Sequence, residues 1–330
     1  MIMKQLVCIA IIVLVACGQT DRMPETSKKE TDRKPGTSIK KPDRKLGRSK
    51  KKTGPLEVVA VNYPLQYFAK RIGGEQVKVT LPVPKNEDPA DWRPMGAPAR
   101  EFIAKAQKAD LILLNGAGYA KWIKYGSWRE AQLVHTSLTI KDSLLEIGKE
   151  HQAAHKHDKG GKEHSHAAVA YTLWLDPQLA VRQAQAIRDA FSREKPDHKE
   201  RFAANYEKLE ADLLSLGKDM PKSKTPLLAS HPVYQYLERR FELKLKSVHW
   251  EPEIAPPAGE WEALKATLKE HPAKWMIWEG DPLPETARQL READVEPILF
   301  DPCSNVPEEG DYLIVMRANF ANLQKALSGE

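Results

Sequence analysis

Short apolar runs alternate with helical periodicities from Leu56 to the end of the chain. This alternation is typical of βα units, in which buried parallel strands are covered by amphipathic helices. The first series predicts strands at Leu56–Val61, Val77–Leu81, Leu111–Asn115 and Gln132–His135, and helices near Leu65–Ile72 and Ala97–Lys108. The second series predicts strands at Leu227–Ser230, Lys246–Trp250, Trp275–Trp278 and Pro297–Phe300, and helices around Val233–Phe241, Glu260–Glu270, Pro284–Glu292 and Asp311–Leu327.

A long helical stretch over residues 178–218, interrupted by Pro196, separates the two series. Apolar residues recur on both sides of this proline at the spacing of one buried helix face. We therefore expect an α/β fold of two lobes, residues 55–177 and 219–330, with mostly parallel sheets joined by a long bridging helix. Because ligands prefer the space between lobes and the carboxyl ends of parallel strands, we also expect a ligand cleft between the lobes.

The first residues have the pattern of a secretion signal. A short positive start precedes the 11-residue apolar run Leu6–Ala16, which suits a signal-peptide core and is too short to span a bilayer. The run ends in Leu14-Val15-Ala16-Cys17-Gly18, which resembles the lipobox of bacterial lipoproteins. The resemblance implies that residues 1–16 are removed and that Cys17 carries a diacylglycerol and acyl lipid anchor. An ordinary secretory signal with an incidental cysteine is the alternative, and both interpretations place the protein outside the cytoplasm.

Basic residues are concentrated in a repeated segment that follows. Residues 21–53 are three 11-residue repeats with 13 Lys and Arg and five Asp and Glu, which leaves a formal charge of −3 for residues 54–330 once Lys4 is set aside. Few apolar side chains and many like charges predict a disordered tether over residues 17–54. The simplest role for such a tether is to hold the folded domain away from a membrane. Attraction of its positive charge to anionic lipid headgroups or cell-wall polymers is the alternative. The acidic body gives no support for nucleic-acid binding.

The cysteines do not predict a disulfide framework. The chain of 330 residues has three Cys, and 41% of its residues are hydrophobic, which is ordinary for a globular core. If Cys8 is removed with the signal and Cys17 is lipidated, Cys303 is left without an intrachain partner.

Five of the ten histidines lie within sixteen residues, at His151, His155, His157, His164 and His166. Imidazoles at this density can capture Zn, Ni or Cu, although the segment has no spacing that selects one ion. A solvated segment with incidental histidines is the alternative.

Two other polar residues each follow a predicted strand. His231 comes after Leu227–Ser230, and Asp301 comes after Pro297–Phe300. Either alone would more often be a helix cap or a satisfied polar group, but their shared placement at strand ends makes them candidate ligands.

Several motifs together resemble one family. They are the lipobox, the His-rich segment, Asn115-Gly116-Ala117-Gly118-Tyr119-Ala120-Lys121-Trp122, Trp174-Leu175-Asp176-Pro177 and Ser230-His231. The chain is similar over residues 55–330 to the periplasmic zinc- and manganese-binding proteins of bacterial metal-uptake ABC transporters. The resemblance implies two α/β lobes bridged by a long helix, with one metal held between them by three His and one Asp or Glu.

The resemblance carries over only two of the four ligands. His231 and Asp301 are retained, whereas Ala90 and Thr172 stand where the family has its first and second His. A site with one imidazole and one carboxylate leaves most of a tetrahedral Zn shell to water, so weak binding is expected.

Other side chains could complete the shell. His166 precedes Thr172 by six residues, which span about 20 Å when extended, so His164 or His166 could reach the cleft. Glu279 and Asp91 could supply oxygen ligands. Cys303 could offer a thiolate, although a buried thiol that behaves as a small apolar group is the more usual case.

We therefore expect a monomeric, lipid-anchored solute-binding protein that captures Zn, with Mn or another divalent ion as the alternative metal, and delivers it to an ABC permease. A divergent paralogue that binds a non-metal ligand, or that buffers metal through its His-rich segment, is the alternative. An enzyme is not expected, because no phosphate-binding loop or Gly-x-Ser-x-Gly elbow occurs and Gly116-x-Gly118 lacks the third glycine of a dinucleotide fingerprint.

Overall fold

The computed structural model describes residues 54–147 and 169–328. The predicted signal peptide, Cys17, the basic repeats and the clustered histidines, including His164 and His166, lie outside the described residues. No helix of the described residues is long and apolar enough to cross a membrane.

The first sheet contains four parallel strands in the order β2-β1-β3-β4. Its strands are β1 (Leu56–Ala60), β2 (Val77–Thr80), β3 (Leu111–Leu114) and β4 (Leu133–His135), with α1 (Tyr63–Gly73) and α2 (Gly96–Lys108) between them in sequence. Every residue of β3 is apolar and buried, as expected when both faces of a parallel sheet are covered. Helix α1 begins after Asn62, whose side chain accepts a hydrogen bond from the Leu65 amide, and has Pro64 in its first turn.

The second sheet repeats this plan, with parallel strands in the order β6-β5-β7-β8. Its strands are β5 (Pro226–Ala229), β6 (Lys244–Ser247), β7 (Trp275–Trp278) and β8 (Glu296–Leu299), and its helices are α5 (Gln235–Phe241), α6 (Ala258–Glu270), α7 (Pro284–Glu292) and α8 (Tyr312–Ser328). In both sheets the first strand lies between the second and the third. Side chains that follow the strands of one sheet therefore gather at one edge.

Short 3₁₀ helices connect several of these elements. They are η1 (Gly74–Gln76), η2 (Lys121–Tyr125), η3 (Glu130–Gln132), η4 (Leu138–Ser143), η6 (Leu173–Leu175) and η7 (Pro196–His198).

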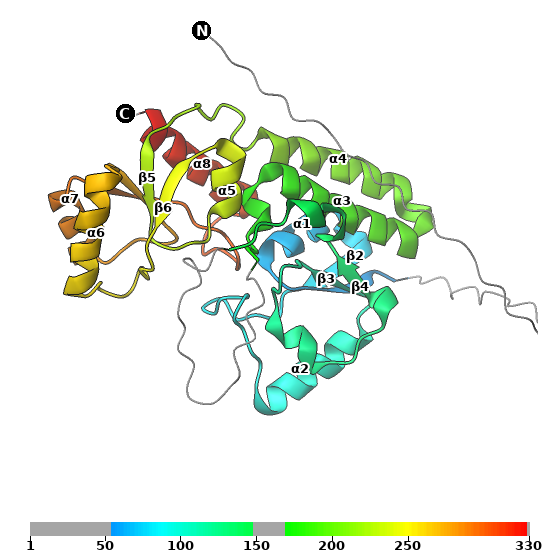
Figure 1. Ribbon diagram of the computed structural model, residues 1–330. Helices are drawn as coiled ribbons and strands as arrows, with labels where there is room; N and C mark the ends of the chain where they lie inside the picture. The colour runs from blue at the N-terminus through cyan, green and yellow to red at the C-terminus, as the bar shows by residue number, and fades with distance from the viewer. Residues whose placement is uncertain (1–53, 148–168, 329–330) are drawn as a thin grey trace, which may run out of the picture. The chain divides into compact units, whose positions relative to one another are not determined.

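The helical stretch between the sheets is made of two helices, α3 (Pro177–Glu194) and α4 (Lys199–Ser215). They run in opposite directions, because the Phe191 ring lies 5.7 Å from that of Phe202 and the Arg188 guanidinium lies 4.7 Å from the ring of Tyr206. Pro196 cannot donate a helical hydrogen bond, so the chain turns there. The expected long bridging helix is therefore a helix hairpin, whose two helices both pack on α1 (Figure 1).

All eight predicted strands are present in the structure. The largest displacement concerns β6, which was expected at Lys246–Trp250 and occupies Lys244–Ser247. The chain beyond Ser247 still follows β5, because the amides of Val248 and Trp250 donate to the carbonyls of Ala229 and Ser230. The predicted range therefore included the second half of β6 and this extension, and it missed Lys244 and Leu245.

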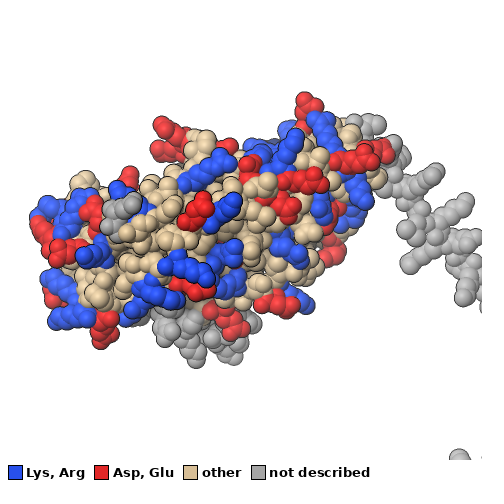
Figure 2. Space-filling view, turned by 90° about the horizontal axis from the view of Figure 1, so that it is seen from above, with Lys and Arg blue, Asp and Glu red and all other residues tan. Residues whose placement is uncertain are grey.

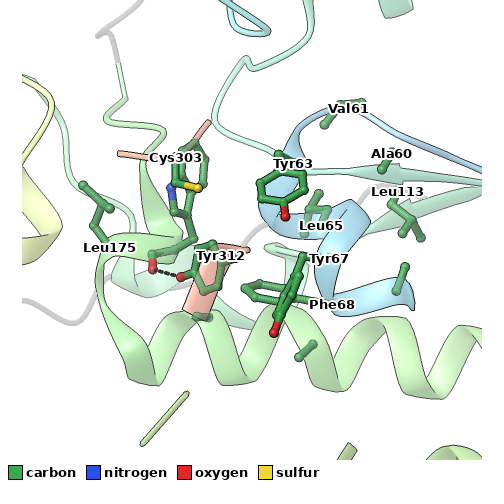
Figure 3. Packing of buried hydrophobic residues seen from close by; sticks show 14 of the residues in the cluster. Ala60, Val61, Tyr63, Leu65, Tyr67, Phe68, Leu113, Leu175, Cys303 and Tyr312 are labelled. Atoms are coloured by element: carbon green, nitrogen blue, oxygen red, sulfur yellow. Dashed lines mark hydrogen bonds between the residues drawn. The ribbon is translucent and has the colours of Figure 1, made fainter. Parts of the chain in front are cut away.

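Contacts between the two lobes are buried and apolar. Tyr312 of α8 packs edge-on against Phe68 of α1, with ring centroids 5.2 Å apart, and also lies against Tyr67 (Figure 3). The Tyr312 hydroxyl donates to the Trp174 carbonyl at 2.9 Å, and the Trp174 indole donates to the Pro302 carbonyl at 2.7 Å. These contacts join the lobes at their core.

Cys303 lies inside this interface as a free, buried thiol. Burial raises its pKa well above the usual range, and the nearby charges of Asp301 and Asp311 raise it further. The side chain therefore acts as a small apolar group rather than as a thiolate ligand.

Charged side chains of both signs are interspersed on the surface shown in Figure 2. This view of the body shows no continuous basic band, in agreement with the charge of −3 over residues 54–330.

Candidate metal site

Each strand of the second sheet is followed by an ionisable side chain. His231 follows β5, Glu279 directly follows β7, Asp301 follows β8, and Glu251 follows the extension of β6. Because all four strands are parallel, these residues share the carboxyl edge of the sheet, in the order Glu251, His231, Glu279, Asp301. We refer to this row as the carboxyl-edge cluster.

His231 lies between two carboxylates of the carboxyl-edge cluster. Its Nδ1 is 3.5 Å from Oε1 of Glu279 and 3.6 Å from Oε1 of Glu251. This nitrogen is buried and has no hydrogen-bond partner among the described residues. Its ring also meets that of His249 edge-on, at a centroid distance of 5.7 Å. Since buried polar atoms are normally satisfied, an unpartnered imidazole nitrogen between carboxylates is a candidate for a cation ligand.

The backbone before His231 is fixed by the sheet. The Ser230 amide donates to the Ile277 carbonyl at 2.8 Å, and the Ser230 carbonyl accepts from the Trp250 amide at 2.8 Å. The strands on either side therefore hold the imidazole in place, which reduces the ordering cost of binding a ligand there.

Glu279 is the most perturbed carboxyl group of the cluster. Burial, together with the charges of Glu251, Asp88, Asp301 and Glu253, raises its pKa from 4.5 to about 8. Near neutral pH this carboxyl group therefore holds a proton, unless a bound cation takes the proton's place.

Asp301 is held at the same edge by hydrogen bonds. Its backbone amide donates to Oδ1 of Asn319 at 3.1 Å, and its carboxylate Oδ1 accepts from the Cys303 amide at 2.7 Å. Burial raises the pKa of Asp301, and the Cys303 amide partly offsets that effect. Its charge acts on Glu279, but within the described residues no ion pair joins it to His231.

The first lobe contributes acidic residues from the loop after β2. Asp91 is exposed and pairs with Lys121, whereas the carboxylates in contact with His231 are those of Glu251 and Glu279. Oδ1 of Asp88 accepts from the Ala90 amide at 2.9 Å. Asp88 is exposed, although partial desolvation raises its pKa and the charges of Asp91 and Glu251 add to this.

The two positions where the family resemblance implies His are packed by smaller residues. Ala90 is 6% exposed and Thr172 is 3% exposed. The Thr172 hydroxyl donates to the carbonyl of Val233, two residues beyond His231. The space and the hydrogen bonds at these positions are therefore already used within the protein.

The described residues contain no group of three or more His, Cys, Asp and Glu side chains arranged to hold a metal ion. The structure brings His231 and Glu279 together, sets Asp301 further along the same edge, and pairs Asp91 with Lys121. A complete shell would need donors beyond these side chains, from water or from the part of the chain that is not described.

Sequence reasoning missed Glu251, Asp88 and His249. Glu251 directly follows the predicted strand Lys246–Trp250, so the rule that selected His231 and Asp301 would have found it had it been applied to every strand. Nothing in the sequence pattern distinguishes Asp88 from its acidic neighbours.

Cavities elsewhere do not involve these residues. One of about 550 Å³ lies between α2 and strands β1 and β2, lined by residues such as Val59 and Phe102. None of the predicted ligands lines it.

Two parallel sheets of identical strand order, a helix hairpin between them and an imidazole among carboxylates at a sheet edge define a two-lobed α/β binding protein. The family described as the periplasmic component A of the zinc-uptake complex, ZnuA, matches residues 58–326, and the chain belongs to this family. The family membership expected from the motifs is thereby confirmed, as are the α/β fold and its two parallel sheets.

Relatives include zinc-binding proteins. The chain is 27% identical to the zinc-binding lipoprotein AdcA of Streptococcus pneumoniae over 84% of this chain and 57% of AdcA. It is 29% identical to the high-affinity zinc uptake system protein ZnuA of Bacillus subtilis over 69% of this chain and 72% of that protein. The chain thus spans little more than half the length of AdcA.

The fold also matches solved structures. The Zn(II)-bound ZnuA-like domain of Streptococcus pneumoniae AdcA superimposes with a TM-score of 0.69, covering 83% of this chain and 99% of that domain at 21% identity. At this identity the match supports the fold and not the ligand set.

Proposed function

We propose that this protein is an extracytoplasmic solute-binding protein that captures a divalent metal ion, with Zn as the favoured ion, and delivers it to an ABC permease. The observation that carries the proposal is the unpartnered Nδ1 of His231 between Glu279 and Glu251, in a chain that belongs to the zinc-uptake component family. The zinc-binding names of the relatives AdcA and ZnuA support the choice of metal.

The donor spacing around His231 supports metal binding. Nitrogen and oxygen donors bind Zn at about 2 Å, so two donors of one tetrahedral ion lie roughly 3.3 Å apart. The distances of 3.5 and 3.6 Å from Nδ1 to the carboxylate oxygens are close to that value. One imidazole with carboxylates also suits Mn, so the ligand chemistry alone does not select Zn.

The cluster's charge would attract and retain a cation. Burial and the repulsion between neighbouring carboxylates raise the pKa of Glu279 in the absence of metal, and a bound divalent ion offsets both effects. We propose His231 and Glu279 as ligands, with Asp301 and Glu251 beside them. Asp91 is the weakest candidate, because it is already paired with Lys121.

The His-rich segment is proposed to collect metal and to supply His164 or His166 to the site. This role is compatible with the lack of a complete ligand group among the described side chains. The described residues on either side of this segment pair with each other, since Glu146 and Val169 form an antiparallel bridge and the Ala170 amide donates to the Leu145 carbonyl.

The anchor and the partners follow from the sequence. We propose that Cys17 carries the lipid, that the basic repeats form the tether to the membrane, and that the protein acts as a monomer. Its function is binding and delivery without catalysis, as the uptake-complex family supports.

Metal titration tests the proposal. Metal-free protein is titrated with Zn in competition with a chromogenic chelator, for the wild type, His231→Ala and His135→Ala. His135 is the matched control, because it lies 3.9 Å from Glu130 in the first lobe, away from the site. We expect tight binding that His231→Ala weakens by at least tenfold and His135→Ala leaves unchanged.

Deletion of residues 151–166 separates the two sources of ligands. Binding that survives the deletion and is lost in His231→Ala identifies the carboxyl-edge cluster as the site. If binding is lost on deletion and is unchanged in His231→Ala, the metal is bound by the His-rich segment alone. That result contradicts the proposed site. Wild-type protein that binds Zn no better than free histidine contradicts the proposed function.

A further inference from the structure

The chain after Asp301 crosses from the second lobe onto the first. The Pro302 carbonyl accepts from the Trp174 indole at 2.7 Å, and the Ser304 carbonyl accepts from the Tyr63 amide at 2.9 Å. The next residue, Asn305, extends this line of contacts to the loop that follows β2. The segment that carries Asp301 is therefore bonded to the first lobe at successive residues.

Asn305 uses its whole amide group in this crossing. Its Nδ2 donates to the carbonyls of Pro84 and Glu87, at 2.6 and 2.8 Å. Its Oδ1 accepts from the Val306 amide at 2.8 Å, which fixes the orientation of the side chain. An amide NH₂ has two protons, so both donors are matched to one loop of the opposite lobe.

The loop held by Asn305 is the one that carries Asp88. The Asp88 carbonyl accepts from the Asp91 and Trp92 amides, at 3.1 and 2.9 Å, so the residues after Glu87 form one hydrogen-bonded turn. Glu87, next to Asp88, is bonded to Asn305, which follows Asp301 by four positions, so this turn is tied to the segment that carries one member of the carboxyl-edge cluster.

Asp88 is also the acidic residue by which the first lobe can add negative charge to the carboxyl-edge cluster. Ala90 and Thr172 offer no imidazole, and Asp91 is paired with Lys121. Where the Asp88 loop lies therefore decides how much negative charge the first lobe adds to a cation held at His231.

We propose that Asn305 is a positioning residue that clamps the Asp88 loop to the second lobe, so that Asp88 helps to retain the cation bound at the carboxyl-edge cluster. The role in retention rests on the proposed function, whereas the clamp itself does not. Without the two donated hydrogen bonds the loop samples positions away from the edge, and the cation leaves faster with little change in its rate of arrival.

Asn305→Asp removes the two donated hydrogen bonds and adds one negative charge. Aspartate has the same shape and still accepts from the Val306 amide, but it places an oxygen against the Pro84 and Glu87 carbonyls. Asn322→Asp is the matched control, because Asn322 also donates its Nδ2 to a carbonyl, that of Leu299 at 3.0 Å, within the second lobe. Both substitutions add one negative charge to the same lobe.

Two measurements on the full chain decide the proposal. Amide hydrogen exchange at Asp91 and Trp92 in metal-free protein reports whether the loop is held. Stopped-flow transfer of Zn to a chelator reports release. We expect Asn305→Asp to speed exchange at both amides and to speed release roughly tenfold relative to Asn322→Asp. We also expect Asp88→Asn to speed release and to leave little further effect of Asn305→Asp.

Each contrary result has a defined meaning. Exchange in Asn305→Asp equal to that in Asn322→Asp overturns the clamp. Faster exchange with unchanged release, in wild-type protein that binds Zn, overturns the positioning role and leaves Asn305 a structural residue. Wild-type protein that binds no cation contradicts the proposed function, while the exchange comparison still decides whether the clamp exists.

Discussion

His231 and Glu279 follow neighbouring strands of one parallel sheet, and Nδ1 of the imidazole lies 3.5 Å from Oε1 of the carboxyl group. Neither residue is fully exposed, with 23% of the His231 side chain and 30% of the Glu279 side chain accessible. A pair of this kind binds either a proton or a metal ion. The pH of the solution therefore controls both the stability of the metal-free protein and its affinity for metal.

The first prediction concerns Glu279 and pH. Its pKa is raised from 4.5 to about 8, so the folded state binds a proton more tightly than the unfolded state between these two values. The stabilisation is complete below the unfolded value and is lost as the pH rises to about 8. We expect Glu279→Gln to be more stable than the wild type at pH 8, by roughly 4 kcal/mol, and similar to it at pH 4.

Urea unfolding of metal-free protein at both pH values measures this difference. Glu253→Gln is a suitable control, because Glu253 is an exposed carboxylate whose charge also acts on Glu279. A Glu279→Gln variant that loses stability equally at pH 4 and pH 8 would show that the side chain matters through packing and not through its charge.

The second prediction concerns metal and thermal stability. A ligand that binds only the folded state at 100 times its dissociation constant stabilises the protein by about 2.7 kcal/mol. We expect Zn to raise the melting temperature of the wild type and of His135→Ala, and to leave that of His231→Ala unchanged. Calorimetry with and without Zn measures the shift. An equal shift in all three proteins would place the bound metal away from His231.

The sequence was sufficient to predict the sheets because their strands are short, apolar and bounded by polar residues. β7 was predicted with the bounds that the structure has, since Trp275–Trp278 is an isolated apolar run. β6 was displaced because Lys244 and Lys246 alternate with apolar residues, a pattern that does not resemble a buried strand. The sequence showed an interruption at Pro196. It did not show that the two helices fold back on each other, because the contact of Phe191 with Phe202 depends on tertiary packing.

The site was predictable only in part, for a physical reason. His231 and Asp301 were found because strand ends of a parallel sheet converge, and that rule needs no knowledge of the other lobe. The Asp91–Lys121 ion pair depends on loop conformation, so Asp91 could not be separated from Asp88 in advance. Asn305 bonds to Glu87 across 218 positions of sequence, and no local pattern encodes such a contact.

The third prediction concerns a missing imidazole. Thr172 is buried and its hydroxyl donates to the Val233 carbonyl, so Thr172→His must displace packed neighbours and leave that carbonyl unsatisfied. We expect a loss of stability of about 2–4 kcal/mol from overpacking and the lost hydrogen bond. Thr172→Val, which keeps the shape, should lose only about 1–2 kcal/mol.

Urea unfolding of both variants separates these effects. Equal stability of Thr172→His and the wild type would mean that the position can accept an imidazole, and that its replacement did not depend on packing.

The last prediction concerns the indole of Trp174, which bonds the segment that carries Asp301. Trp174→Phe keeps an aromatic ring in the core but leaves the buried Pro302 carbonyl without its donor. We expect a loss of about 1–3 kcal/mol in unfolding free energy and a weaker affinity for Zn, because the segment after β8 loses one of its attachments to the first lobe. Trp128→Phe is the matched control, since its indole donates to the Ile123 carbonyl at 2.6 Å within the first lobe. Both variants lose one indole hydrogen bond, but only that of Trp174 connects the lobes. Equal Zn affinity in the two variants, measured by chelator competition, would show that the attachment at Pro302 stabilises the fold without holding Asp301 in place.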